Sequence, residues 1–375
     1  MRTGRSIPSP AVVTVAAACL VLLCLLAVAQ SRRMETRRFV RGLGPGLNLG
    51  NTLDVHDLHF ATRDPAHFET YWGNPLTTRA MLEDIRQAGF TLLRVPVTWE
   101  DHLDPQGTVH PRWMARVRQV VDDALDVGLT VILNAHHDRW YTPDPARLPQ
   151  AEEQMARLWG QIAREFAGYD HRLLFESMNE PRLIGTPEEW GTGTAEAQET
   201  VNRLNRVFVE TVRAGEGYNP RRYLLLPTYC ARAEAAALAA FQLPRGDRLI
   251  ASVHLYTPYG FTLDREGAAG FAPQDPEDTG ELEAVFRDLN CHLIRRGIPV
   301  ILTEFGAVDK GNEGDRAAWA AAVRRQAGRL GIAAVWWDAG PGEEEGQPKP
   351  LYNRHARRWV FPELADALTR QPAGG

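Results

Sequence analysis

Eight short apolar segments, each separated from the next by an amphipathic stretch, set the pattern of the chain from residue 45 onward. They span residues 46–50, 91–97, 130–135, 173–178, 223–227, 249–255, 300–304 and 332–337. Near-continuous apolar strands that alternate with helices form a parallel sheet covered on its outer face. A count of eight favours a closed barrel over an open doubly wound sheet. We therefore predict the α/β class, with a (β/α)8 TIM barrel as a single domain over residues 41–370.

The segments between the predicted strands have apolar residues at helical spacing, which indicates helices packed on the outside of the sheet. These helices are expected at residues 78–88, 115–127, 151–166, 199–214, 281–296 and 315–330. Glycine recurs shortly before the next strand, as is typical of helix C-termini: Gly89, Gly128, Gly168, Gly215, Gly297 and Gly331. No Gly-rich phosphate loop follows the first strand, which argues against a nucleotide-binding domain.

The charge of the chain gives no sign of a polyanionic partner. The sequence has 42 basic and 47 acidic residues, for a formal net charge of -5. The basic residues are scattered along helical segments such as residues 112–118, where a solvated helix face explains them. We expect no nucleic-acid partner and a monomeric protein.

The N-terminus carries an export signal. Residues 11–29 are uncharged and apolar, and they end in Ala27-Val28-Ala29, a small-x-small pattern that signal peptidase reads. The run also approaches the roughly 20 residues that span a bilayer, so residues 1–29 are interpreted as a signal peptide or an N-terminal membrane anchor. Residues 30–40 are expected to be a short basic linker. Both readings predict an extracytoplasmic protein, either secreted or tethered through residues 11–29.

Four cysteines are present, and two of them lie within the export segment. The remaining pair, Cys230 and Cys291, could form one disulfide in an oxidising compartment. Two cysteines give no framework pattern, and we expect free, buried thiols.

Polar side chains close many of the predicted strands, where the chemistry of such barrels gathers. They are Asn51, Arg94, His136, His137, Asn179, Glu180, His254, Tyr256, Glu304, Trp336, Trp337 and Asp338. A lone polar residue at a strand end often only caps a helix or binds loop backbone. Glu180 and Glu304, however, follow the fourth and seventh strands and would face each other across the barrel mouth. Displacement at a sugar carbon requires such a pair of carboxylates.

At these strand ends the sequence resembles glycoside hydrolase family 5, and the resemblance covers nearly the whole chain. It is carried by residues 46–51 (GLNLGN), 93–97 (LRVPV), 134–138 (NAHHD), 175–181 (FESMNEP), 254–256 (HLY), 302–306 (LTEFG) and 336–338 (WWD). It implies a retaining glycoside hydrolase with Glu304 as the nucleophile and Glu180 as the acid/base. It also implies that Arg94 and Tyr256 keep Glu304 ionised, and that the enzyme needs no cofactor.

The resemblance also implies contacts with the sugar. Asn179 would hold the 2-hydroxyl, Trp337 would form the floor of the cleaved subsite, and His136 and His254 would position the reacting groups. His137 and Asn51 would bind hydroxyls farther out. About half of the loop aromatic residues are expected to stack on sugar rings: Tyr71, Trp72, Trp99, Trp140, Tyr141 and Trp190.

Residues 72–75 (WGNP) and the Trp337-Asp338 pair resemble the branch of the family that acts on β-1,4-glucans, which implies cellulose-like chains, xyloglucan or mixed-linkage glucan as substrates. Ala339 and Gly340 depart from the Asn-Gly usual in related enzymes.

Three alternatives remain open. The first is a β-mannanase or another β-glycanase of the same family. The second is a non-catalytic carbohydrate-binding barrel. The third is a metal site at His136, His137 and Asp138, which we disfavour because adjacent histidines on an extended segment point to opposite sides.

Overall fold

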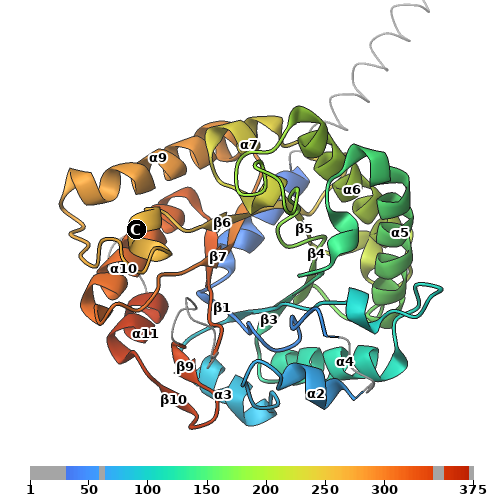
Figure 1. Cartoon of the computed structure of the whole chain (residues 1–375), viewed down its shortest axis with the longest axis horizontal. Helices are drawn as coiled ribbons and strands as arrows, with labels where there is room; N and C mark the ends of the chain where they lie inside the picture. Colours follow the sequence, from blue (N-terminus) through green and yellow to red (C-terminus); the bar gives the residue numbers. More distant parts are fainter. Residues whose placement is uncertain (1–30, 59–63, 341–349, 371–375) are drawn as a thin grey trace, which may run out of the picture.

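The computed structural model describes residues 31–58, 64–340 and 350–370, and its centre is a closed eight-stranded barrel (Figure 1). All neighbouring strands pair in parallel, and β1 pairs with both β2 and β8 to close the ring. The strands are β1 (Gly46–Asn48), β2 (Leu92–Val95), β3 (Thr130–Asn134), β4 (Leu173–Glu176), β5 (Leu224–Pro227), β6 (Leu249–Leu255), β7 (Val300–Phe305) and β8 (Ala333–Trp336). The predicted fold class is confirmed, and each strand lies within one or two residues of its predicted bounds.

Helices surround the barrel and cover its outer face (Figure 1). The six predicted ones are α3 (Arg79–Gln87), α4 (Pro111–Asp126), α5 (Leu148–Glu165), α6 (Ala195–Arg213), α9 (Pro276–His292) and α10 (Glu313–Leu330). Five of them begin earlier than predicted, and three of these five have a proline in the first turn, where its missing N–H costs nothing.

The sequence pattern did not reveal the shorter elements. These are α2 (Pro65–Glu69), α7 (Ala235–Ala240), α8 (Tyr259–Thr262), α11 (Pro362–Thr369) and the hairpin of β9 (Tyr352–Asn353) and β10 (Arg358–Trp359). Gly297 and Gly331 end their helices in the left-handed conformation, as predicted, and Gly89 and Gly128 also have positive φ. Gly168 and Gly215 do not.

An apolar layer fills the half of the barrel interior that lies near the N-terminal ends of the strands. It is built from inward-facing residues near the start of the strands, among them Leu92, Ile132, Leu174 and Ile301. Residues 31–42, in the region expected to be a linker, form a helix that closes this end (blue in Figure 1). Its Val40 is fully buried in the same layer. The neighbouring Phe39 ring stacks on Tyr223 with 3.8 Å between ring centroids.

Nearer the C-terminal ends of the strands, the barrel interior is polar. The next inward-facing side chains along the strands are all buried: Asn48, Arg94, Asn134, Glu176, Ser252 and Thr303. The pairing of β7 with β6 and with β8 is irregular near its C-terminal end. Such an irregularity re-aims a side chain, and here Thr303 and the adjacent Glu304 both reach partners inside the barrel.

Both cysteines in the described part of the chain are free, as expected, although Cys291 is exposed and only Cys230 is buried. The predicted export segment, residues 11–29, lies outside the described residues. Within the described residues, no helix is both long and apolar enough to cross a membrane.

Candidate active site

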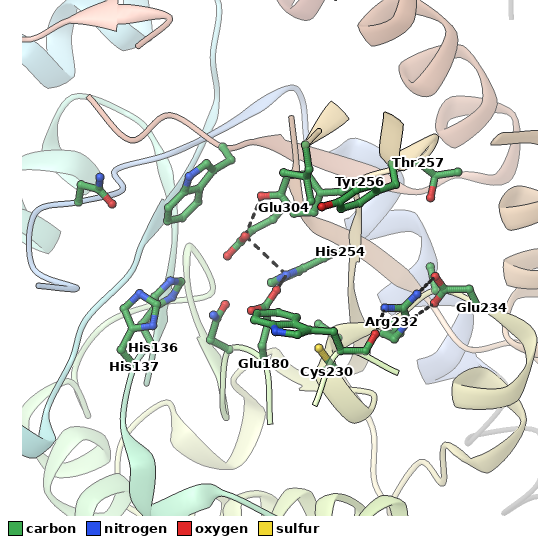
Figure 2. A pocket seen from close by; sticks show the side chains of 18 of the residues that line it. His136, His137, Glu180, Cys230, Arg232, Glu234, His254, Tyr256, Thr257 and Glu304 are labelled. Atoms are coloured by element: carbon green, nitrogen blue, oxygen red, sulfur yellow. Dashed lines mark hydrogen bonds and ion pairs between the residues drawn. The ribbon is translucent and has the colours of Figure 1, made fainter. Parts of the chain in front are cut away.

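A cavity of about 1220 Å³ opens at the C-terminal ends of the strands (Figure 2). Nine of the ten residues predicted for the site line it: Asn51, His136, His137, Asn179, Glu180, His254, Tyr256, Glu304 and Trp337. The tenth, Arg94, is fully buried and contacts two of these residues, Glu304 and Asn179. The structure therefore brings together the ten residues predicted for the site, whereas Trp336 and Asp338, also named at a strand end, are buried and do not line the cavity.

Glu304 is held by two donors from opposite sides. Arg94 Nη1 donates to its Oε1 at 2.7 Å, and the Tyr256 hydroxyl donates to its Oε2 at 3.0 Å. Its side chain is only 7% exposed. Burial raises the pKa of Glu304, while the neighbouring His254 and Arg94 charges oppose that rise. The donors fix both carboxylate oxygens and orient the group within the cavity.

Glu180 lies just beyond β4, and its side chain is more accessible, at 18% exposed. His254 Nδ1 lies 2.8 Å from its Oε1, and Arg182 Nη1 lies 3.5 Å from its Oε2. Burial alone would raise the pKa of Glu180, but the His254 bond and the nearby positive charges lower it. Burial likewise disfavours the cationic form of His254, yet the charges of Glu304 and Glu180 raise its pKa. Both pKa changes favour the proton of this hydrogen bond on the imidazole and not on the carboxylate.

The two glutamates are close together. One oxygen of each carboxylate and a nitrogen of His254 all lie within 4.8 Å of one another. In glycoside hydrolases a carboxyl separation of about 5–5.5 Å accompanies direct attack by one carboxylate, whereas about 6.5–9.5 Å leaves room for a water. The geometry suits a nucleophile opposite a proton donor.

Asn179 is oriented by the buried Arg94, whose Nη2 donates to the Asn179 side-chain oxygen at 2.7 Å. This bond occupies the amide oxygen and fixes which end of the side chain is the NH2 group. Asn179 lines the cavity beside Glu180, so its NH2 group can donate to a sugar hydroxyl there.

Trp337 and His136 form one wall of the cavity, with nearly parallel rings 5.7 Å apart between centroids. Gly50 allows the tryptophan to lie there, because a Cβ at that position would be 2.8 Å from the indole ring. His136 Nδ1 lies 3.0 Å from the Asn134 side-chain nitrogen, and burial lowers the pKa of His136 well below its ordinary value. A neutral imidazole beside an indole is a suitable surface for a sugar ring.

His136 and His137 do not point to opposite sides, contrary to the expectation from strand alternation. Both line the cavity, with ring centroids 4.4 Å apart (Figure 2). The reason is that β3 ends at Asn134, so both histidines lie in the loop that follows. Asp54 could join them around a metal ion. Its two oxygens, however, accept the backbone N–H groups of Asn51 and Thr52, which explains Asp54 as a residue that shapes its loop.

Of the six loop aromatic residues, Trp72 and Trp190 line the cavity, while Trp99 and Tyr141 are buried in the core. Trp140 lines a separate, smaller cavity, and Tyr71 is exposed outside both cavities. Trp190 is 58% exposed, and the Arg182 guanidinium lies 4.3 Å from the centroid of its ring. Tyr259, which the sequence did not single out, is 65% exposed and also lines the cavity.

Asn74 joins two loops of the cavity rim, a role that the sequence did not reveal. Its side-chain nitrogen donates to the Asn51 carbonyl at 2.8 Å and to the Ala339 carbonyl at 3.0 Å. Ala339 thus contributes to the rim through its backbone carbonyl. Gly340 has φ +69°, and a Cβ there would lie 1.9 Å from the Asn74 side-chain oxygen.

Comparison with known proteins finds a matching family model and relatives with consistent names. The family model described as Cellulase (glycosyl hydrolase family 5) matches residues 58–343. Endoglucanase B of Ruminococcus albus is 41% identical over 340 residues, which cover 90% of this chain and 80% of that protein. Endoglucanase A of Clostridium longisporum is 38% identical over 349 residues, 92% of this chain and 67% of that longer protein.

Solved structures agree with the sequence relatives. A broad specificity endoglucanase from Clostridium longisporum superposes with a TM-score of 0.86 at 36% identity, covering 89% of this chain and 97% of that one. A xyloglucan-specific endo-β-1,4-glucanase from a metagenomic library, in complex with cellotriose, gives a TM-score of 0.84 at 32% identity. That match covers 91% of this chain and 99% of the other.

Proposed function

Because the chain belongs to glycosyl hydrolase family 5 and is a retaining endo-β-1,4-glucanase, we propose that Glu304 and Glu180 carry out its two displacement steps. In the first step a Glu304 oxygen attacks the anomeric carbon, and the glycosidic bond breaks. Glu180 gives its proton to the departing oxygen. In the second step Glu180 takes a proton from water, which attacks the same carbon and releases Glu304.

The close spacing of the two carboxylates is the observation that carries this proposal. The assignment of roles is supported by their partners. Glu304 accepts hydrogen bonds from Arg94 and Tyr256, at 2.7 and 3.0 Å, and these bonds orient its carboxylate as the attacking group. Glu180 shares a 2.8 Å bond with His254, so one proton transfer from Nδ1 to Oε1 produces the acid that the leaving group needs. Asn179 is the proposed partner of the sugar 2-hydroxyl.

The proposed substrates are β-1,4-glucan chains of several kinds, including xyloglucan and mixed-linkage glucan. Trp72 lies beside His137 and Trp337 beside His136. Trp190 and Tyr259 line the same cavity from the segments that follow β4 and β6. Aromatic rings at separate positions along the cavity suit a chain of several sugars. The names of the structural neighbours, broad specificity and xyloglucan-specific endoglucanases, support the same substrate class.

We further propose that the enzyme is monomeric and acts outside the cytoplasm, after export through residues 1–29. This location is supported by the apolar run of residues 11–29 and by the size of glucan polymers, which do not enter cells. Release by signal peptidase after Ala29 and retention as a membrane tether are distinguished by N-terminal sequencing of the mature protein.

The test of the substrate and stereochemistry uses carboxymethylcellulose, mixed-linkage glucan, xyloglucan and β-mannan in parallel, with product lengths measured over time. We expect internal cleavage of the three glucans and at most weak cleavage of mannan. NMR of the first products should show the β-anomer. A first product of α configuration would contradict the two-step mechanism, and faster cleavage of mannan than of any glucan would contradict the substrate assignment.

The pH profile of kcat/KM is expected to be bell-shaped, with both limbs displaced upward. Glu304 must be ionised, and its pKa lies above the ordinary 4.5, so activity should rise with pH through a value above 4.5. The proton of the Glu180–His254 pair must be present, and the pKa of His254 lies above the ordinary 6.5. Activity should therefore fall only above that pH.

The control for the alkaline limb is His254→Ala, which removes the second site for the shared proton. Its alkaline limb should move to lower pH. Its acidic limb should move to higher pH, because Glu304 loses the nearby imidazolium charge that lowers its pKa. An unchanged alkaline limb in this variant would show that His254 does not hold the proton.

A further inference from the structure

Arg94 binds two carboxylates, and only one of them reaches the cavity. Its Nη1 donates to Glu304 at 2.7 Å, while its Nε donates to Glu176 Oε2, also at 2.7 Å. The side chains of Arg94 and Glu176 are both 0% exposed. Glu176 does not line the cavity, so it meets neither substrate nor solvent there. Its connection to the reaction runs through Arg94.

Glu176 is surrounded by hydrogen-bond donors at both of its carboxylate oxygens. Besides Arg94, the Asn134 side-chain nitrogen donates to its Oε2 at 3.1 Å, and the Ser252 hydroxyl donates to its Oε1 at 2.5 Å. Ser252 in turn lies 2.6 Å from the Thr303 hydroxyl. A carboxylate that accepts bonds at both oxygens is stabilised in its ionised form. The buried polar layer is thus arranged around the Glu176 carboxylate.

The proposed first step changes the charge balance around Arg94. When Glu304 forms an ester with the sugar, its negative charge is lost. Arg94 keeps its proton, because a guanidinium stays protonated in proteins, and the Glu176 charge opposes the effect of burial on its pKa. A buried cation without a compensating anion is strongly disfavoured. Glu176 is the carboxylate that remains in contact with Arg94 at that stage.

We propose that Glu176 is the counterion of Arg94 in the covalent intermediate, and that this positioning residue makes loss of the Glu304 charge tolerable. The inference rests on the proposed roles of Glu304 and Glu180. It also gives a reason for placing two carboxylates on one guanidinium. One carboxylate reacts. The other holds the Arg94 side chain in place and compensates its positive charge throughout the catalytic cycle.

The test follows formation and decay of a trapped intermediate. A 2-deoxy-2-fluoro-β-cellobioside with a dinitrophenolate leaving group forms an ester at the nucleophile, and the leaving group departs as an anion that needs no proton. Glu176→Gln keeps the shape of the side chain and removes its charge. We expect its inactivation rate constant to fall on the order of 100-fold. Its reactivation rate should be unchanged or faster, because the intermediate itself is destabilised.

The matched control is Glu176→Asp, which keeps the charge and should stay within about tenfold of the wild type. Equal losses in the Asp and Gln variants would show that geometry matters and charge does not, and would overturn the proposal. So would an unchanged inactivation rate in Glu176→Gln.

A second comparison does not depend on the folding of Glu176→Gln. In Arg94→Gln, Glu176 is a buried anion with no cation beside it, so the double variant Arg94→Gln/Glu176→Gln should be more stable and at least as fast in forming the intermediate. A double variant that is slower than Arg94→Gln would mean that Glu176 acts independently of Arg94.

The site of labelling separates this inference from the proposed function. Peptide mass spectrometry of the inactivated wild type should find the sugar on Glu304. A label on any other residue would overturn the assignment of the nucleophile, whatever the Glu176 variants do. A label on Glu304 with unaffected Glu176 variants would overturn only the role of Glu176.

Discussion

Replacing Glu304 with alanine is expected to lower kcat by on the order of 10⁵-fold or more, because no other group can take its place at the anomeric carbon. The described part of the chain offers only one other carboxylate in the immediate group around His254, and that is the proposed acid, Glu180. The Glu304→Ala variant should fold normally, because Glu304 lines a cavity and water can fill the space that its side chain leaves.

Azide makes this prediction specific. Azide fits the space left by the Glu304 side chain and attacks the anomeric carbon in a single displacement. Because a single displacement inverts the configuration of a β-glycoside, the product should be an α-glycosyl azide. The variant should be tested with an activated aryl cellobioside at increasing azide concentration, with the product identified by NMR. Activity near that of the wild type without azide would refute the assignment, and a β-azide would exchange the roles of the two glutamates.

The expected loss in Glu180→Ala depends on the leaving group, which distinguishes it from the first variant. Polysaccharide cleavage needs a proton for a poor leaving group and should fall by about 10²–10⁴-fold. A dinitrophenyl cellobioside needs no such proton, so its first step should proceed at close to the normal rate. The second step lacks its base, and the intermediate should accumulate as a burst of dinitrophenolate.

Azide should relieve the second step of Glu180→Ala, because an anion needs no general base, and the product should be a β-glycosyl azide. Pre-steady-state absorbance measures the burst, and the matched control is Arg182→Gln, which removes a contact with Glu180 but leaves the acid itself. Equal losses on both substrates in Glu180→Ala would show that Glu180 has no role in protonation.

The barrel and its two glutamates could be predicted because both depend on patterns of short range. Apolar strands alternate with helices of ordinary length, and the strand ends carry the polar residues. The direction of the Glu304 side chain could not be predicted from such a pattern. Simple alternation would send Thr303 and Glu304 to opposite faces, and only the irregular pairing of β7 turns both inward.

Other features depend on contacts between loops that are distant in sequence. Asn74 is 265 residues from Ala339, yet it joins that residue to the Asn51 loop. Tyr259 lies on α8, a helix too short to show periodicity. Glu176 stood within a recognised segment, but its role became visible only once Arg94 was found to bind two carboxylates.

The helix of residues 31–42 closes the end of the barrel opposite the cavity, and residues 11–29 immediately precede it in the chain. If those residues stay in a membrane, the end of the barrel that residues 31–42 close faces the bilayer. The cleft then opens away from the lipid, toward polymer in the surroundings, and the height of the barrel separates the reacting groups from the membrane. Cleavage after Ala29 would release the same catalytic body without altering its opening, so tethered and free forms should differ in reach and not in chemistry.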